Sequence, residues 1–187
     1  MKKLLLHSCC APCSTAVLER LLSDMPEFDI LVFYYNPNIY PEAEYEKRKA
    51  EQIKYINLIN NPRITFIDAD YESELFEEKV KDLHNEKEGG ARCSVCFALR
   101  LDKTARKAKE LSCDMFGTTL TVSPHKNATV INRIGKELEI QYNIKFLESD
   151  FKKKDGYKRS IVLSKENNIY RQNYCGCRYS IWFETNE

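Results

Sequence analysis

The sequence lacks the glycine-rich and histidine-rich motifs that define several common enzyme classes. Its six glycines are dispersed, so they form neither a P-loop nor a G-x-G-x-x-G loop for phosphate groups. The three histidines, His7, His84 and His125, do not have the spacing of metal ligands. We expect His7, on a predicted strand, to be a packed and hydrogen-bonded core residue. These absences argue against a phosphate-cradling glycine loop and against a histidine-based metal site.

Long apolar runs and an excess of one charge are also missing. The first apolar run consists of Leu4, Leu5 and Leu6 and stops at His7, far short of a secretory signal or a membrane span. We therefore expect a cytoplasmic protein without membrane contact, in a compartment that keeps thiols reduced. The formal net charge is only +1, so any contact with nucleic acid must come from local basic patches.

Cysteine, in contrast, is abundant and unevenly distributed. Seven of the eight cysteines lie in three groups near the start, the middle and the end of the sequence: Cys9, Cys10 and Cys13; Cys93 and Cys96; Cys175 and Cys177. In a reducing compartment, grouped cysteines indicate metal binding or catalysis rather than a disulfide scaffold. Cys113 stands alone before an apolar stretch, and we expect it to be a buried, inert thiol.

Strand-like and helix-like patterns alternate along the chain. The strands are predicted at 3–8, 29–35, 64–69, 115–118 and 144–147, and the helices at 42–60, 72–84 and 128–142, with others beginning near Pro12 and Cys93. This alternation predicts a single α/β domain, 1–187, with a Rossmann-like parallel sheet and helices on both faces. Residues 150–159 are expected to form a loop and 160–168 a short helix. The C-terminal segment 150–187, including Trp182 and Phe183, is expected to pack back and complete a metal site.

The first two cysteine groups are suited to bind one metal centre. The first group lies where a strand ends and a helix begins, which in a parallel sheet is the edge where ligands bind. The free N–H groups at a helix N-terminus also favour thiolates. The C-x-x-C pair can place two more sulfur atoms on one side of a helical turn. Four thiolates suit a structural zinc ion or a [4Fe–4S] cluster equally well, and the surplus of three further thiols favours the cluster.

The last cysteine pair has a glycine between its thiols. Gly176 allows the chain to bend so that Cys175 and Cys177 approach each other. Two such thiols could store two electrons as a disulfide, ligate a second metal, or add ligands to the first metal. Redox use is the favoured interpretation.

Basic and aromatic residues flank these groups and are candidates for contact with a substrate. The candidates are Arg92, Lys158, Tyr170, Arg171 and Tyr174. Basic residues interleaved with tyrosines suit phosphate contact and base stacking on single-stranded RNA. Taken alone, the lysine-rich run around Lys158 is better explained as a solvated loop, whereas the run from Tyr170 to Tyr174 directly precedes the last cysteine pair.

Five motifs in order along the chain resemble the QueH family of epoxyqueuosine reductases. They are HSCCAPC at 7–13, YNPNI at 35–39, EGGARCSVC at 88–96, TTL at 118–120 with Ser123-Pro124, and YRQNYCGC at 170–177. The resemblance extends over nearly the whole chain. It implies an oxidoreductase of queuosine biosynthesis, which reduces epoxyqueuosine at the wobble position of tRNA to queuosine. The epoxide is converted to an alkene and water.

The resemblance also implies cofactors and partners. It implies an iron–sulfur enzyme that does not use cobalamin, with the tRNA anticodon stem-loop and an electron donor protein or reductant as partners. Carried over residue by residue, the ligands of a [4Fe–4S] cluster fall on Cys9, Cys10, Cys93 and Cys96. A redox-active or metal-binding pair falls on Cys175 and Cys177, which could hold a second, mononuclear iron. Cys13 is a further candidate catalytic thiol, whose role the motif does not define.

The fold implied by the resemblance is that of nucleotide α-hydrolase-like tRNA-modifying pyrophosphatases. Their Ser-Gly-Gly loop is replaced here by Ser8-Cys9-Cys10, so the use of ATP is not expected. Removing the epoxide oxygen takes two electrons and two protons. Asp150, Asp70 and Tyr35 are unranked candidates for the proton donor.

Two alternatives of other classes stay open at this point. The first is a zinc-stabilised RNA-binding module without catalysis, which predicts bound zinc and no visible absorption band. The second is a thiol-disulfide oxidoreductase that acts through Cys175 and Cys177, which predicts activity in metal-free protein.

Overall fold

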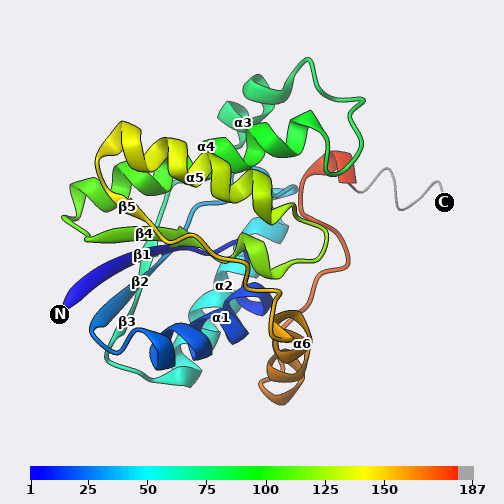
Figure 1. The fold of residues 1–187 in the computed structure, drawn as a ribbon. Coiled ribbons are helices and arrows are strands. Elements are labelled where there is room, and N and C mark those ends of the chain that lie inside the picture. The colour runs from blue at the N-terminus through cyan, green and yellow to red at the C-terminus, as the bar shows by residue number, and fades with distance from the viewer. Residues whose placement is uncertain (181–187) are drawn as a thin grey trace.

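The computed structural model describes residues 1–180 and contains a five-stranded sheet in which every paired strand is parallel. The strands are β1 (Lys2–His7), β2 (Phe28–Tyr34), β3 (Ile64–Asp68), β4 (Met115–Thr118) and β5 (Lys145–Phe146). Their order is β3-β2-β1-β4-β5, so β1 lies at the centre (Figure 1). The predicted Rossmann-like α/β fold is therefore confirmed.

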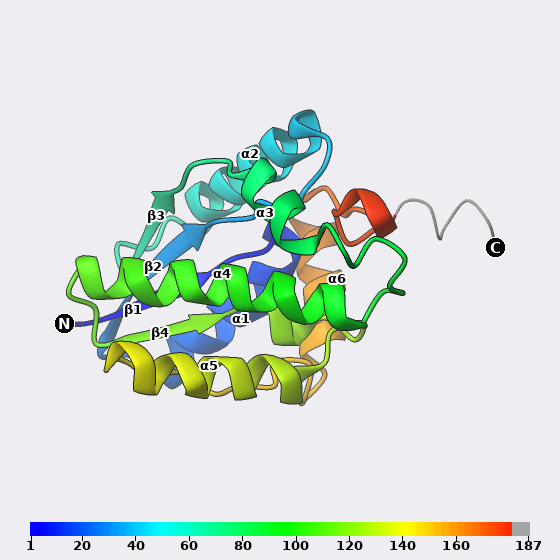
Figure 2. The ribbon, with the colours of Figure 1, turned by 90° about the horizontal axis from the view of Figure 1, so that it is seen from above.

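Helices cover both faces of the sheet, as predicted. One face carries α1 (Ala11–Asp24), α2 (Glu42–Ile59) and α6 (Gly156–Glu166), and the other carries α4 (Ala91–Glu110) and α5 (Ala128–Tyr142). The short helix α3 (Ser73–Val80) packs on the outer side of α4, as Figure 2 shows from above. A 3₁₀ turn, η1 (Leu120–Val122), follows β4. No helix of the described residues is long and apolar enough to cross a membrane.

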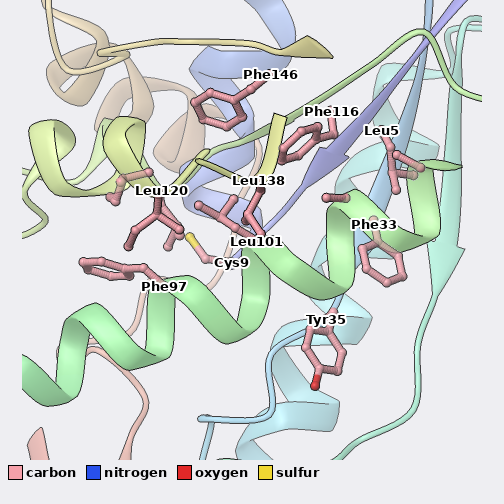
Figure 3. Packing of buried hydrophobic residues seen from close by; sticks show 14 of the residues in the cluster. Leu5, Cys9, Phe33, Tyr35, Phe97, Leu101, Phe116, Leu120, Leu138 and Phe146 are labelled. Atoms are coloured by element: carbon pink, nitrogen blue, oxygen red, sulfur yellow. The ribbon is translucent and has the colours of Figure 1, made fainter. Parts of the chain in front are cut away.

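The central position of β1 explains its continuous apolar sequence. Leu4, Leu5 and Leu6 are all fully buried, because successive side chains of a strand point to opposite faces and both faces are covered. Leu5 packs with Phe33 and Phe116 beneath α4 and α5 (Figure 3), while Leu4 and Leu6 pack beneath α1 and α2. Burial of a leucine side chain stabilises the fold by about 1.5–3 kcal/mol.

The structure corrects two predicted helix boundaries. Helix α3 ends at Val80 rather than near 84, because the backbone carbonyls that follow it are bound by the side chain of Arg92. Helix α6 begins at Gly156, within the predicted loop, directly after the left-handed backbone of Asp155. An ion pair between Arg159 and Glu19 of α1, at 2.6 Å, fixes this first turn, which no apolar pattern signals. The predicted packing of Trp182 and Phe183 lies outside the described residues.

Candidate metal centre

The first cysteine group lies at the carboxyl edge of the sheet, as predicted. Cys9 follows β1, Cys10 is the residue that caps the N-terminus of α1, and Pro12 lies in the first turn of that helix. The sulfur atoms of Cys9, Cys10 and Cys13 all lie within 4.8 Å of one another. Within residues 1–180, no other three metal-ligating side chains come this close. The strand-to-helix turn therefore gathers three soft ligands at one point.

The other two cysteine groups meet the first at two adjoining cavities. The larger cavity, about 440 Å³, is lined by the three thiols of the first group and by Cys175. The smaller cavity is lined by four thiols from the other two groups: Cys93, Cys96, Cys175 and Cys177. Cys175 faces both cavities, and so do four charged or titratable residues: Glu88, Arg100, His125 and Lys126. Three segments remote in sequence thus bring their thiols to one edge of the sheet.

The segment that carries the last cysteine pair is held in place by the loop after β2 and by α2. The backbone N–H of Tyr40 donates to the carbonyl of Gly176 at 2.8 Å, and Nη1 of Arg48 donates to the carbonyl of Cys175 at 3.1 Å. Gly176 has a φ of 123°, and a Cβ atom there would lie 2.9 Å from Nη1 of Arg48. The glycine is therefore required both by the backbone conformation and by the close approach of Arg48.

Several of the thiols receive hydrogen bonds from the surrounding chain. The sulfur of Cys93 accepts from the backbone N–H of Gly89 at 3.1 Å, and the sulfur of Cys10 accepts from Nε2 of Gln172 at 3.2 Å. Hydrogen bonds to sulfur stabilise its anionic form and tune the potential of metal–thiolate centres. The donors come from two segments far apart in sequence, which fixes the orientation of the thiols before any metal is bound.

The three thiols of the first group have very different acidities. The pKa of Cys9 is held well below its usual value, because the thiols of Cys10 and Cys13 donate hydrogen bonds to it. The pKa of Cys13 is raised by the hydrogen bonds that it donates to Cys10 and Cys9, with burial adding to the effect. In the second group, burial raises the pKa of Cys96 to about 12, although the neighbouring Arg100 opposes the shift. Cys9 is thus the thiolate already prepared to bind a metal cation.

Positive charge accumulates beneath the thiols. Arg100 is 2% exposed, and neither Arg100 nor Lys126 forms an ion pair with a carboxylate within residues 1–180. Burying an unpaired charge costs on the order of several kcal/mol, so an anion is needed as a partner. Thiolates bound to a metal supply such an anion. The residues present therefore fit a metal–thiolate centre, both in the softness of their ligands and in their charge.

His7 is a packed core histidine, as predicted. Its ring lies 2.9 Å from Oγ1 of Thr118 and 3.0 Å from the carbonyl of Tyr35, and it is fully buried. Burial, with the nearby charge of Arg100, lowers the pKa of His7 to about 3. The imidazole is neutral and supports the floor of the site.

The predicted substrate residues lie in different surroundings. Arg171 and Tyr174 line the larger cavity. Tyr170 lies beside it, with its ring 3.5 Å from the ammonium of Lys47. Lys158 is exposed and pairs with Asp155 at 3.0 Å.

Arg92 is placed differently from the other predicted substrate residues. It is only 1% exposed, and its Nη1 donates to three backbone carbonyls of residues 83–86. The guanidinium thus holds the loop in front of Cys93, and the side chain also lines the smaller cavity, so a substrate contact of Arg92 stays a prediction.

None of the three candidate proton donors lines either cysteine cavity. Asp150 lines an open groove of about 1010 Å³ between α1 and α5, and Asp70 lines a third cavity beside α4. The ring of Tyr35 packs with Phe33, and Figure 3 shows its hydroxyl directed away from Cys9. The cavities instead expose His125 and Lys126, which the sequence placed in a polar loop without assigning them a role.

Sequence reasoning also missed the polar residues beneath the thiols. Tyr45 and Ile56 are buried on α2 as predicted, but Arg48 and Gln52 are buried on the same helix. Asn36 and Gln172 were quoted within motifs and were given no role. The only indication of their role in the sequence was that each belongs to a motif that contains a cysteine or lies beside one in space.

Comparisons with known proteins agree with this site. The family model described as epoxyqueuosine reductase QueH matches residues 4–182. An epoxyqueuosine reductase QueH from Staphylococcus epidermidis is 46% identical over 183 residues, which is 95% of this chain and 76% of the relative. One from Streptococcus pyogenes is 46% identical over 180 residues, 95% of this chain and 69% of the relative. One from Thermotoga maritima is 39% identical over 185 residues, 97% of this chain and 91% of the relative.

Comparison with solved structures supports the fold. A structure from Methanocaldococcus jannaschii, described as a predicted subunit of tRNA methyltransferase, has a TM-score of 0.55 at 12% identity and covers 89% of this chain and 75% of its own. At this identity the likeness bears on the fold alone. The match of the family model over nearly the whole chain, and relatives with up to 46% identity, establish the relationship. The chain therefore belongs to the QueH family of epoxyqueuosine reductases.

Proposed function

We propose that this protein reduces epoxyqueuosine in tRNA to queuosine at an iron–sulfur centre on the carboxyl edge of the sheet. One observation carries the proposal: seven thiols from three remote segments line two adjoining cavities next to the buried Arg100, which has no carboxylate partner among residues 1–180. The relatives named as epoxyqueuosine reductases indicate the substrate.

The cysteines divide into two roles in this proposal. Four of them hold a [4Fe–4S] cluster: Cys9, Cys10, Cys93 and Cys96. Cys175 and Cys177, together with Cys13, act as redox-active thiols or hold a second, mononuclear iron. When bound, such a centre supplies electrons one at a time and a Lewis acid for the epoxide oxygen. In this proposal the protein is a single domain, and the described part of the C-terminal segment, 150–180, completes the site, since Cys175 faces both cavities.

The larger cavity receives the modified base. Its volume of about 440 Å³ lies within the range of small-molecule pockets. Lys126 faces both cavities, and its ammonium has no carboxylate partner among residues 1–180. Lys126 donates a hydrogen bond, and then a proton, to the epoxide oxygen as the first carbon–oxygen bond breaks. A second proton from water and two electrons from the reductant release the oxygen as water and leave the alkene. Burial alone would lower the pKa of Lys126, but the negative charge of Cys175, Cys9 and Cys13 together holds this pKa above its usual range, so the ammonium is charged.

The anticodon stem-loop binds over the mouth of the larger cavity. Tyr170, Arg171 and Tyr174 stack on bases and contact phosphates at its rim, and Lys158 on α6 adds a phosphate contact. Affinity for tRNA should then fall as the salt concentration rises. The electrons come from a donor protein or a small reductant, and the reaction takes place in the cytoplasm, where tRNA and reduced thiols occur together.

Anaerobic purification followed by iron, sulfide and zinc determination tests the proposal. We expect iron and sulfide, a visible absorption band, an electron paramagnetic resonance signal after reduction, and conversion of an epoxyqueuosine-containing stem-loop. A colourless zinc protein that binds RNA without turnover would favour the RNA-binding module. Full activity in metal-free protein would favour the thiol-disulfide oxidoreductase.

A further inference from the structure

Arg100 is a buried cation whose hydrogen-bond partners are an amide, a histidine ring and a thiol. It projects from α4, one helical turn after Cys96, and is 2% exposed. Its Nη2 donates to Oδ1 of Asn36 at 2.6 Å, and its Nε lies 3.3 Å from Nε2 of His7. Asn36 is uncharged, and a histidine ring carries either no charge or a positive one. Neither neighbour can balance the charge of the guanidinium.

The remaining neighbour of Arg100 is a thiol of the site. Its Nη1 donates to the sulfur of Cys96 at 3.8 Å, and its side chain lines both cysteine cavities. A guanidinium remains charged at every pH that the fold tolerates. The countercharge must therefore come from thiolates, or from a metal centre bound to them.

The two other buried arginines near the site are paired differently. Arg48 pairs with the carboxylate of Glu44 at 2.7 Å. Arg92 donates to backbone carbonyls and lies over the ring of Tyr179. Among these three arginines, Arg100 alone combines a hydrogen bond to a thiol with the lack of a carboxylate partner inside the described part of the chain.

We propose that Arg100 is a positioning residue that provides a fixed positive charge for the metal–thiolate centre and raises its reduction potential. This inference rests on the proposed function, because it presupposes an iron–sulfur centre at these thiols. Each electron added to such a centre makes it more negative, and a nearby cation stabilises the reduced form more than the oxidised form. The effect is large only because Arg100 is shielded from water.

Replacement of Arg100 tests the inference without relying on activity. The variants are Arg100→Gln and Arg100→Lys, and the control is Arg106→Gln on the same helix, where Arg106 is exposed and pairs with Asp102 at 2.5 Å. The readouts are the midpoint potential from a redox titration followed by electron paramagnetic resonance, and the iron and sulfide content per chain. We expect a more negative potential in Arg100→Gln, a smaller shift in Arg100→Lys, and wild-type values in Arg106→Gln.

Asn36 allows the charge to be cancelled while the guanidinium stays in place. Asn36→Asp keeps an acceptor for Arg100 and adds a negative charge, but it loses the hydrogen bond from Nδ2 to the carbonyl of Ser8, at 2.9 Å. Asn36→Ala loses that same donor without adding charge. If charge is the cause, the potential of Asn36→Asp falls below that of Asn36→Ala. This pair decides the question if Arg100→Gln does not fold.

The failure of this inference is distinguishable from that of the proposed function. If the wild-type protein contains no iron and sulfide, the proposed function fails first. If it contains both, but Arg100→Gln and Asn36→Asp keep the wild-type potential, the role of Arg100 is refuted and the proposed function stands.

Discussion

The two edges of the sheet use the same residue types in opposite ways. At the amino edge, Cys113 is half-buried without another cysteine beside it, and the groove of about 490 Å³ around it contains the exposed lysines Lys2, Lys109 and Lys145. At the carboxyl edge, seven thiols line two cavities that the buried Arg100 also lines. A thiol or a cation exposed to water carries little chemistry by itself. Burial of both together prepares the carboxyl edge for a metal.

The largest effect is expected from removing Cys93 at the carboxyl edge, with Cys113 at the amino edge as the control. We expect Cys93→Ala to abolish both the brown colour and turnover, because it removes a proposed cluster ligand. Cys113→Ser should keep both, and it should change the stability by no more than about 1 kcal/mol. Iron content, absorption spectrum and stem-loop conversion check the pair. A colourless but active Cys93→Ala protein would remove the proposed mechanism.

The second largest effect is expected from replacing Lys126 at the carboxyl edge, with Lys109 at the amino edge as the control. Lys126→Met should lower turnover by about 10²-fold while iron content is kept, because a positioned proton donor typically contributes this factor. Lys109→Met is the matched control, since Lys109 is exposed at the opposite edge and its ammonium donates to the carbonyl of Tyr142. Lys126→Arg should restore part of the rate. Wild-type turnover in Lys126→Met would exclude this residue as the proton donor.

A moderate effect is expected from replacing Gly176, which lies between Cys175 and Cys177 and approaches Arg48 closely. Gly176→Ala should lower stability by about 1–3 kcal/mol, since the alanine would have a strained backbone and would crowd Arg48 and Ile39. Gly89→Ala separates the two causes, because Gly89 also has a positive φ, 87°, but no atom lies within 4 Å of its added Cβ. Thermal denaturation and the iron content measure both variants. Equal losses in the two proteins would show that crowding at Gly176 is unimportant.

The smallest effect concerns the reactivity of Cys113 in the iron-loaded protein. Burial raises the pKa of this thiol above its usual value. Since only the thiolate reacts, alkylation at pH 8 should be slower than that of a small-molecule thiol, and its rate should still be rising above pH 9. Mass spectrometry after iodoacetamide treatment should find Cys113 as the main modified site. Equal modification of the seven other cysteines would indicate that they are not bound to metal.

Much of the fold could be predicted from the sequence, because local patterns determine it. The apolar run at Leu4, Leu5 and Leu6 identified the central strand, and the alternation of strands and helices identified the sheet. The start of α6 was missed because its anchor is an ion pair between Arg159 and Glu19, and the pairing of residues so distant in sequence leaves no local pattern.

The site could be predicted only in part. The cysteine groups identified its position, since thiols at three places have no local explanation. The buried cations were missed because Arg100 and Arg48 lie in helices where charged residues ordinarily face water. Burial of such residues is decided by the tertiary fold. The hydrogen bonds from Arg92 to the carbonyls of its own loop were missed for the same reason, since nothing in its motif shows them.

The sharing of Cys175 between both cavities has a consequence for biogenesis. At ordinary translation rates, the ribosome makes Cys175 on the order of ten seconds after Cys9. During that interval both cavities lack Cys175 as a lining residue, and Arg48 lacks the carbonyl of Cys175 that it later binds. Iron delivered to the nascent chain would therefore meet a site that is incomplete and open to solvent. The proposed iron–sulfur centre would therefore be inserted after Cys175 has been made.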